Sequence, residues 1–120
     1  MDQNSPAELA RRNVIEVFNT SDTARRRELI EDMYDPDAMF YDAENTAPGR
    51  ESVIDAIGAL LANSAGLTFT VAVEPAQLGD VARISWALSP RDAPPVATGQ
   101  DFVVTKNNRI AELYTFVDQA

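Results

Sequence analysis

The stretch LTFTVAVEPAQLGDVARISWALSPRDAPPVATGQDFVVTKNNRIAELYTFVD, residues 67–118, decides the fold class. Apolar and polar residues alternate along it with a period of two, which is typical of strands that bury one face. Segments rich in proline, glycine or asparagine interrupt the alternation and predict turns. The pattern therefore predicts four strands, antiparallel to their neighbours, at 67–74, 81–89, 96–105 and 109–118.

Helical patterns precede this stretch. Ser5, Pro6 and Glu8 form a capping box that predicts a helix at about 6–19, with Asn13 among the side chains left outside. A second helix follows the Ser21-Asp22 cap and ends near Asp35, because Pro36 comes next. A short strand and a polar loop lead to a third helix. These last three segments are expected at 38–42, 43–49 and 50–66.

The order of these elements predicts the architecture. Helices that come first and strands that come afterwards favour an α+β fold, with the helices on one face of a curved antiparallel sheet. The length of 120 residues is that of one domain, which we expect to span 1–120 and to form an ordinary core.

The composition limits the chemistry. The chain has no cysteine and no histidine, which excludes disulfides, thiolate zinc sites and imidazole general bases. It has no phosphate-binding glycine loop either, so we expect no cofactor, neither zinc nor a nucleotide. Catalysis, if present, would have to use carboxylates, hydroxyls and arginine.

The charge limits the partners. Ten basic and 19 acidic residues give a formal net charge of −9, which argues against binding to nucleic acid. No apolar run reaches membrane-spanning length, and the polar N-terminus does not resemble a signal peptide. We therefore expect a soluble, cytoplasmic protein that binds neither nucleic acid nor a membrane.

Four short motifs carry a family resemblance: NTSD at 19–22, YDPDA at 34–38, GRESV at 49–53, and GQDF at 99–102 followed by RIAE at 109–112. In this order they resemble the SnoaL-like branch of the nuclear transport factor 2-like superfamily, over nearly the whole chain. The resemblance implies a cone-shaped sheet around three N-terminal helices, the cystatin-like α+β barrel. It also implies an apolar pocket at the open end and an outer sheet face that is often used for homodimerisation.

Two aspartates are the catalytic candidates. In the ketosteroid isomerase relatives, an aspartate at the place of Asp42 is a general base, and one at the place of Asp101 helps to hold an oxyanion. A carboxyl moved into an apolar cavity has a raised pKa and can shuttle protons near neutral pH. That branch also has a tyrosine on its first helix where this chain has Val14, so ketosteroid isomerase activity itself is not expected.

Each aspartate also has a structural alternative. Asp42 stands at a strand end and could simply turn into the polar loop. Asp101 could face solvent or pair with an arginine such as Arg83, which would lower its pKa and leave it a fixed anion.

Arg83 and Ser85 permit a second comparison. The limonene epoxide hydrolase relatives place Arg-x-Asp on this strand and another aspartate on the last strand, whereas this chain has Ser85 and Thr115 at the matching places. Without those carboxylates we expect no epoxide hydrolase. Arg83 remains a candidate for binding a ligand oxygen.

Alternation does not say which side of the strand at 81–89 faces the pocket. If Ile84 and Trp86 lie inside, they shape an apolar pocket; if outside, they join a dimer surface with Phe102, Val104, Tyr114 and Phe116. We expect the ligand to be contacted by residues from both halves of the chain, namely Val14, Phe18, Tyr41, Arg83, Ser85, Trp86 and Thr115.

The sequence and the resemblance together favour a homodimeric protein that binds an apolar small molecule bearing a carbonyl or hydroxyl group. As an enzyme it would be a cofactor-free isomerase or cyclase, with Asp101 and Asp42 moving the proton. The alternative is a non-catalytic ligand-binding or dimerisation module.

Overall fold

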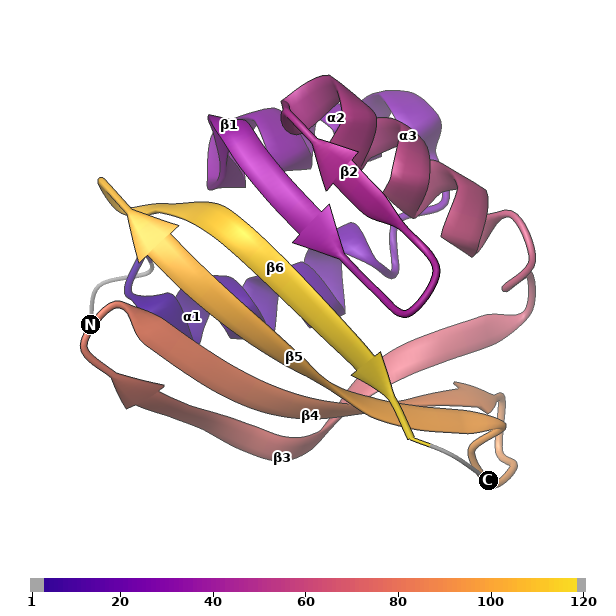
Figure 1. Cartoon of the computed structure of the whole chain (residues 1–120). Coiled ribbons are helices and arrows are strands. Elements are labelled where there is room, and N and C mark those ends of the chain that lie inside the picture. The colour runs from indigo at the N-terminus through magenta and orange to yellow at the C-terminus, as the bar shows by residue number, and fades with distance from the viewer. Residues whose placement is uncertain (1–3, 119–120) are drawn as a thin grey trace.

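The computed structural model describes residues 4–118 and shows helices packed on a curved, six-stranded sheet (Figure 1). The strand order is β2-β1-β6-β5-β4-β3, and the sheet does not close into a barrel. The α+β class is confirmed. The elements are α1 (Pro6–Arg12), its π-helical continuation η1 (Asn13–Val17), α2 (Thr23–Met33), β1 (Tyr34–Tyr41), β2 (Thr46–Pro48), α3 (Arg50–Leu61), β3 (Leu67–Leu78), β4 (Val81–Pro90), β5 (Ala97–Lys106) and β6 (Arg109–Val117).

One strand pair differs from the expected antiparallel sheet. β1 runs parallel to β6, whereas β3 to β6 form an antiparallel meander as predicted. A hairpin forces neighbouring strands to be antiparallel, but β1 and β6 are far apart in the sequence and are free of this constraint. The short strand β2, within the expected polar loop, pairs with β1 and was not predicted.

The first two helices begin at their predicted caps. Ser5 Oγ accepts a hydrogen bond from the Glu8 N–H at 3.2 Å, and Asp22 Oδ1 accepts one from Ala24 N–H at 3.1 Å. α2 ends two residues earlier than expected, and Pro36 lies inside β1. Proline has no N–H for the ladder, and the pairing of β1 with β6 is irregular around it, between Tyr34 and Met39.

The core lies between the helices and the inner face of the sheet, which we define as the face that packs on α1. Figure 1 shows α1 against this face. In β4 this face carries Ala82, Ile84 and Trp86, all buried, whereas Arg83 is exposed on the outer face. The structure thus resolves the alternative that alternation left open. Within residues 4–118, no helix is both long and apolar enough to cross a membrane.

Asn19 attaches the end of the first helix to the sheet. Its side-chain Nδ2 donates to the carbonyl oxygen of Phe69 at 2.9 Å, and its Oδ1 accepts from the N–H of Phe69 at 2.8 Å. The amide therefore replaces a neighbouring strand for one residue of β3, and it places Phe69 beside Phe18.

Candidate functional site

A cavity of about 760 Å³ lies between the first helix, the end of α3 and the inner face of the sheet. Its walls are mostly apolar. Phe18, Phe69 and Trp86 form a row of edge-to-face ring contacts, with centroids 5.4 Å apart in each pair. The mouth is formed by the β1–β2 loop and the end of β6. Such a space suits an apolar small molecule.

Asp101 is the buried carboxyl of this cavity. It lies on the inner face of β5 between Ile84 of β4 and Thr115 of β6, and only 3% of its surface is exposed. Its Oδ1 accepts hydrogen bonds from the indole Nε1 of Trp86 at 3.0 Å and from the hydroxyl of Thr115 at 2.9 Å. The two donors come from the neighbouring strands and fix the orientation of the carboxyl.

The second oxygen of Asp101 faces the cavity. Within residues 4–118, Oδ2 accepts no hydrogen bond. An oxygen without a hydrogen bond would count among the fully buried, unpartnered polar atoms if it were completely buried, and Oδ2 is not one of them. It therefore keeps some exposed surface, and Asp101 contributes to the cavity wall. Oδ2 is therefore the oxygen that a bound molecule can reach.

Burial raises the pKa of Asp101 to about 6, against the opposing effect of the hydrogen bonds from Thr115 and Trp86. This agrees with the raised pKa expected from the sequence. The alternative of an arginine partner does not apply, because no ion pair joins Asp101 to Arg83 in the described part of the chain. Asp101 is thus a desolvated carboxyl with neutral partners.

A buried polar pair lies near Asp101. The hydroxyl of Tyr34 donates to Oδ1 of Asn13 at 2.6 Å. Burial, followed by the charge of Asp101, raises the pKa of Tyr34 well above its usual value, so this phenol stays neutral. Asn13 is fully buried, contrary to the prediction from helical periodicity. The π-helical turn, in which Phe18 N–H bonds to Asn13 oxygen at 3.1 Å, turns it inward.

Asp42 lies at the mouth, where it shapes the β1–β2 loop. Its Oδ1 accepts hydrogen bonds from the backbone N–H groups of Glu44 at 2.9 Å and Asn45 at 2.7 Å, and from the side chain of Asn45 at 3.1 Å. These contacts match the structural alternative, a strand-end carboxylate that turns the chain. In the described residues no group of three or more acidic side chains could hold a metal ion.

Most of the predicted ligand residues come together at this cavity. Its wall includes Val14, Phe18, Tyr41, Trp86 and Thr115, together with the two candidate aspartates.

The positions of Arg83 and Ser85 require a correction. Both lie on the outer face of β4, outside the cavity, because the burial of Ile84 and Trp86 turns the odd-numbered residues outward.

Several wall residues were not predicted to lie at the site. Phe69 comes from β3, and Leu60 and Leu61 come from the end of α3. Tyr114 and Phe116, predicted for a dimer surface, also reach the mouth. A bulky aromatic on a period-two strand was the available signal for Phe69, but only the strand register brings it next to Trp86.

Known structures share this fold. A proposed isomerase of the SnoaL-like family from Agrobacterium tumefaciens strain C58 has a TM-score of 0.81 and 27% identity, over 88% of this chain and 91% of that chain. A proposed polyketide cyclase from Sinorhizobium meliloti has a TM-score of 0.67 and 22% identity, over 84% and 87%. A proposed ketosteroid isomerase from Kribbella flavida has a TM-score of 0.70 and 16% identity, over 98% and 80%.

Two sequence comparisons complete the assignment. A search of curated proteins found no match. The family model of the SnoaL-like domain matches residues 12–119, which include every strand and the whole cavity wall. The chain belongs to the SnoaL-like domain family, within the nuclear transport factor 2-like fold.

Proposed function

We propose that this protein is a cofactor-free isomerase or cyclase that moves a proton on an apolar carbonyl or hydroxyl compound. One observation carries the proposal: a buried carboxyl, Asp101, has one oxygen held by two donors and the other exposed to an apolar cavity. The similar structures proposed to be an isomerase and a polyketide cyclase support the same reaction class.

Asp101 has the properties of a general base. With a pKa of about 6 it is mostly ionised at pH 7, yet its conjugate acid is strong enough to return the proton. In the proposed step, Oδ2 takes a proton from a carbon next to the carbonyl, and the enolate forms. In a substrate with a C=C bond conjugated to the enolate, Asp101 then returns the proton to the far carbon of the dienolate. The double bond moves, and the substrate is isomerised with no change in its atoms or oxidation state.

The wall of the cavity limits the substrates. Within residues 4–118, the first helix contributes the apolar Val14 and Phe18 to the wall, so it supplies no hydroxyl there for the enolate oxygen. We therefore expect a substrate whose C–H is already acidic, such as a carbon between two carbonyl groups.

Deuterium exchange tests this function. The protein is incubated in D₂O with cyclic ketones and 1,3-diketones, and enzyme-dependent incorporation at the carbon next to the carbonyl is followed by NMR. We expect Asp101→Asn to lose at least about a hundredfold in rate, as removal of a general base usually does. Asp92→Asn, an exposed aspartate in the β4–β5 turn, should keep the full rate. Equal rates in wild type and Asp101→Asn would disprove the proposal.

The second candidate is a non-catalytic ligand-binding module. Asp42 favours it, because its hydrogen bonds hold the β1–β2 loop. Among residues 4–118, this leaves Asp101 as the one carboxyl deep in the wall. Ligand binding without deuterium exchange in the wild type would support this module instead of the enzyme.

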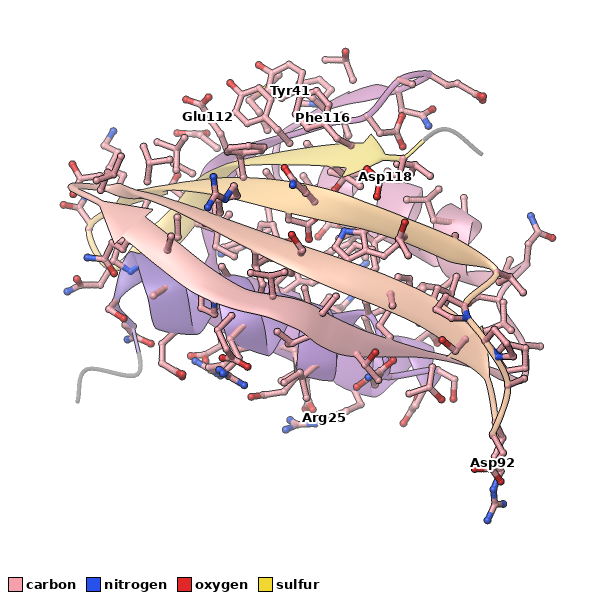
Figure 2. The ribbon with its side chains drawn as sticks, turned by 90° about the horizontal axis from the view of Figure 1, so that it is seen from below. Arg25, Tyr41, Asp92, Glu112, Phe116 and Asp118 are labelled. Carbon is pink, nitrogen blue, oxygen red and sulfur yellow. The ribbon has the colours of Figure 1, made fainter. Side chains whose placement is uncertain are left out.

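We further propose that two chains pair through the outer face of the sheet. Phe102 and Phe116 meet there with centroids 5.7 Å apart, and Phe116 is 58% exposed. Tyr41 stacks on Tyr114 beside them, and Tyr41 and Phe116 lie at the same side of the sheet (Figure 2). Exposed aromatic groups of this kind are typical of interfaces. Ile84 and Trp86 do not take part, because they lie inside.

A further inference from the structure

The charged groups that line the cavity within residues 4–118 are all of one sign. Its wall contains the carboxylates of Asp42, Glu44 and Asp101, and no lysine or arginine among the described residues. Arg83, the basic residue expected there, lies on the outer face. We infer that the ligand of this cavity carries no acidic group, and that a basic nitrogen on an apolar body strengthens binding. The inference rests on the proposed function in taking this cavity as the ligand site.

The deep end of the cavity provides the first argument. Asp101 is 3% exposed, its two hydrogen-bond donors are neutral, and its Oδ2 has no partner in residues 4–118. The groups around it are apolar or uncharged, including the phenol of Tyr34. A second anion placed in this apolar space would lose hydration and be repelled, whereas a cation would be attracted.

The mouth provides the second argument. Glu44 is exposed and forms no ion pair in the described chain, and the loop holds the Asp42 carboxylate in place through three hydrogen bonds to Oδ1. The formal net charge of −9 also draws cations toward the protein and repels anions.

Three probes with the same apolar body test the inference: 1-adamantanemethylamine, 1-adamantanemethanol and 1-adamantanecarboxylate. They differ in charge and absorb little near 280 nm, so binding can be followed through the fluorescence of Trp86, the only tryptophan. At pH 7.5 we expect the amine to bind most tightly and the carboxylate about tenfold or more below the alcohol. A carboxylate that binds as tightly as the alcohol would overturn the inference, as would failure of all three to bind at millimolar concentration.

Variants separate local charge from net charge. Asp101→Asn keeps an oxygen for the two donors and removes the charge, so it should bring the three affinities closer together. Glu44→Gln should do so in part. Asp92→Asn removes one charge at the tip of the β4–β5 turn, far from Tyr41 and Phe116 (Figure 2), and should leave the order unchanged. If Asp92→Asn alters the order as much as Asp101→Asn does, the cavity charges are not the cause.

The two proposals can fail separately. The affinity order is a binding measurement and needs no turnover. If the three probes bind in the expected order of affinity but no deuterium exchange occurs, only the proton transfer is disproved. If exchange occurs but the probes do not bind in that order, only the charge preference is disproved.

Discussion

Asp101 combines two opposing contributions to stability. Removal of its carboxyl from water favours the neutral form, while the hydrogen bonds from Thr115 and Trp86 favour the charged form. Because the folded pKa of about 6 exceeds the ordinary value of 3.8, the folded state binds this proton more tightly than the unfolded state. The residue thus stabilises the fold less at neutral pH than in mild acid.

This predicts a pH dependence of stability that depends on Asp101. Protonation of Asp101 contributes to the unfolding free energy, and this contribution is fully present below pH 3.8 and is lost as pH rises through about 6. The difference is roughly 3 kcal/mol. In Asp101→Asn this loss should disappear. Urea denaturation of both proteins from pH 4 to pH 8 measures it, with Asp92→Asn as the exposed control. A wild-type and an Asp101→Asn profile of the same shape would contradict the prediction.

Thr115 provides a second prediction at the scale of the residue. Thr115→Val keeps the shape and removes the hydroxyl that donates to Asp101 Oδ1, so the pKa of Asp101 should rise further above 6. A hydrogen bond to a charged group contributes roughly 1.5 kcal/mol, which is about tenfold in proton affinity. Carboxyl-carbon NMR titration measures the change. Ser85→Ala, on the outer face, should leave the titration as it is in the wild type.

Among the strands, the close packing of β4 on β5 depends on a glycine that lies opposite a tryptophan. Gly99 pairs with Trp86 in the ladder, and a Cβ at Gly99 would overlap the indole ring and the carbonyl oxygen of Phe116. The bare backbone lets the indole ring approach β5 closely, with its Nε1 donating to Asp101. The geometry of the carboxyl therefore depends on this close approach.

Gly99→Ala should displace the ring and weaken its bond to Asp101. We expect a loss of about 1–3 kcal/mol in unfolding free energy, as for other overpacked positions, and a shifted fluorescence maximum of Trp86. Gln100→Ala is the matched control: it lies next in the same strand with its side chain on the outer face, and it should change neither quantity appreciably. An unshifted emission maximum in Gly99→Ala would show that the indole does not need this space.

Asn19 stabilises the contact between the end of the first helix and β3. Asn19→Ala removes two hydrogen bonds to the backbone of Phe69, and it should cost about 1–3 kcal/mol in urea denaturation. Asn63→Ala, at an exposed asparagine after α3, should cost less than about 0.5 kcal/mol. Equal effects of the two substitutions would mean that the amide of Asn19 does not hold β3 to the first helix.

At the scale of the whole molecule, the proposed pairing of two chains through the outer face is directly measurable. Sedimentation at micromolar concentration should give twice the mass of 13.1 kDa. Phe116→Glu places a charge in the proposed contact and should shift the equilibrium toward the monomer. Leu78→Glu, at an 83% exposed residue where β3 ends, is the control and should stay dimeric. A wild-type protein that stays monomeric up to millimolar concentration would refute the dimer.

The sequence by itself determined the kinds of elements and the range of possible chemistry. Local signals were sufficient for the caps at Ser5 and Asp22 and for the four long strands, because caps, turns and periodicity act between residues close in the chain. Composition excluded thiol and imidazole chemistry without any structure. Asp101 was identified as a candidate through the resemblance to the ketosteroid isomerase relatives, which have an aspartate at its place.

Only the tertiary structure decided which side of each strand is inside. Alternation with a period of two separates the residues of a strand into two sets but does not say which set is buried. The packing of α1 on one face of the sheet places Trp86 inside and Arg83 outside. The π-helical turn that buries Asn13 shifts the helical phase by a backbone change that periodicity does not register. The parallel pairing of β1 with β6 joins segments some seventy residues apart, and contacts between such distant residues leave no local pattern in the sequence.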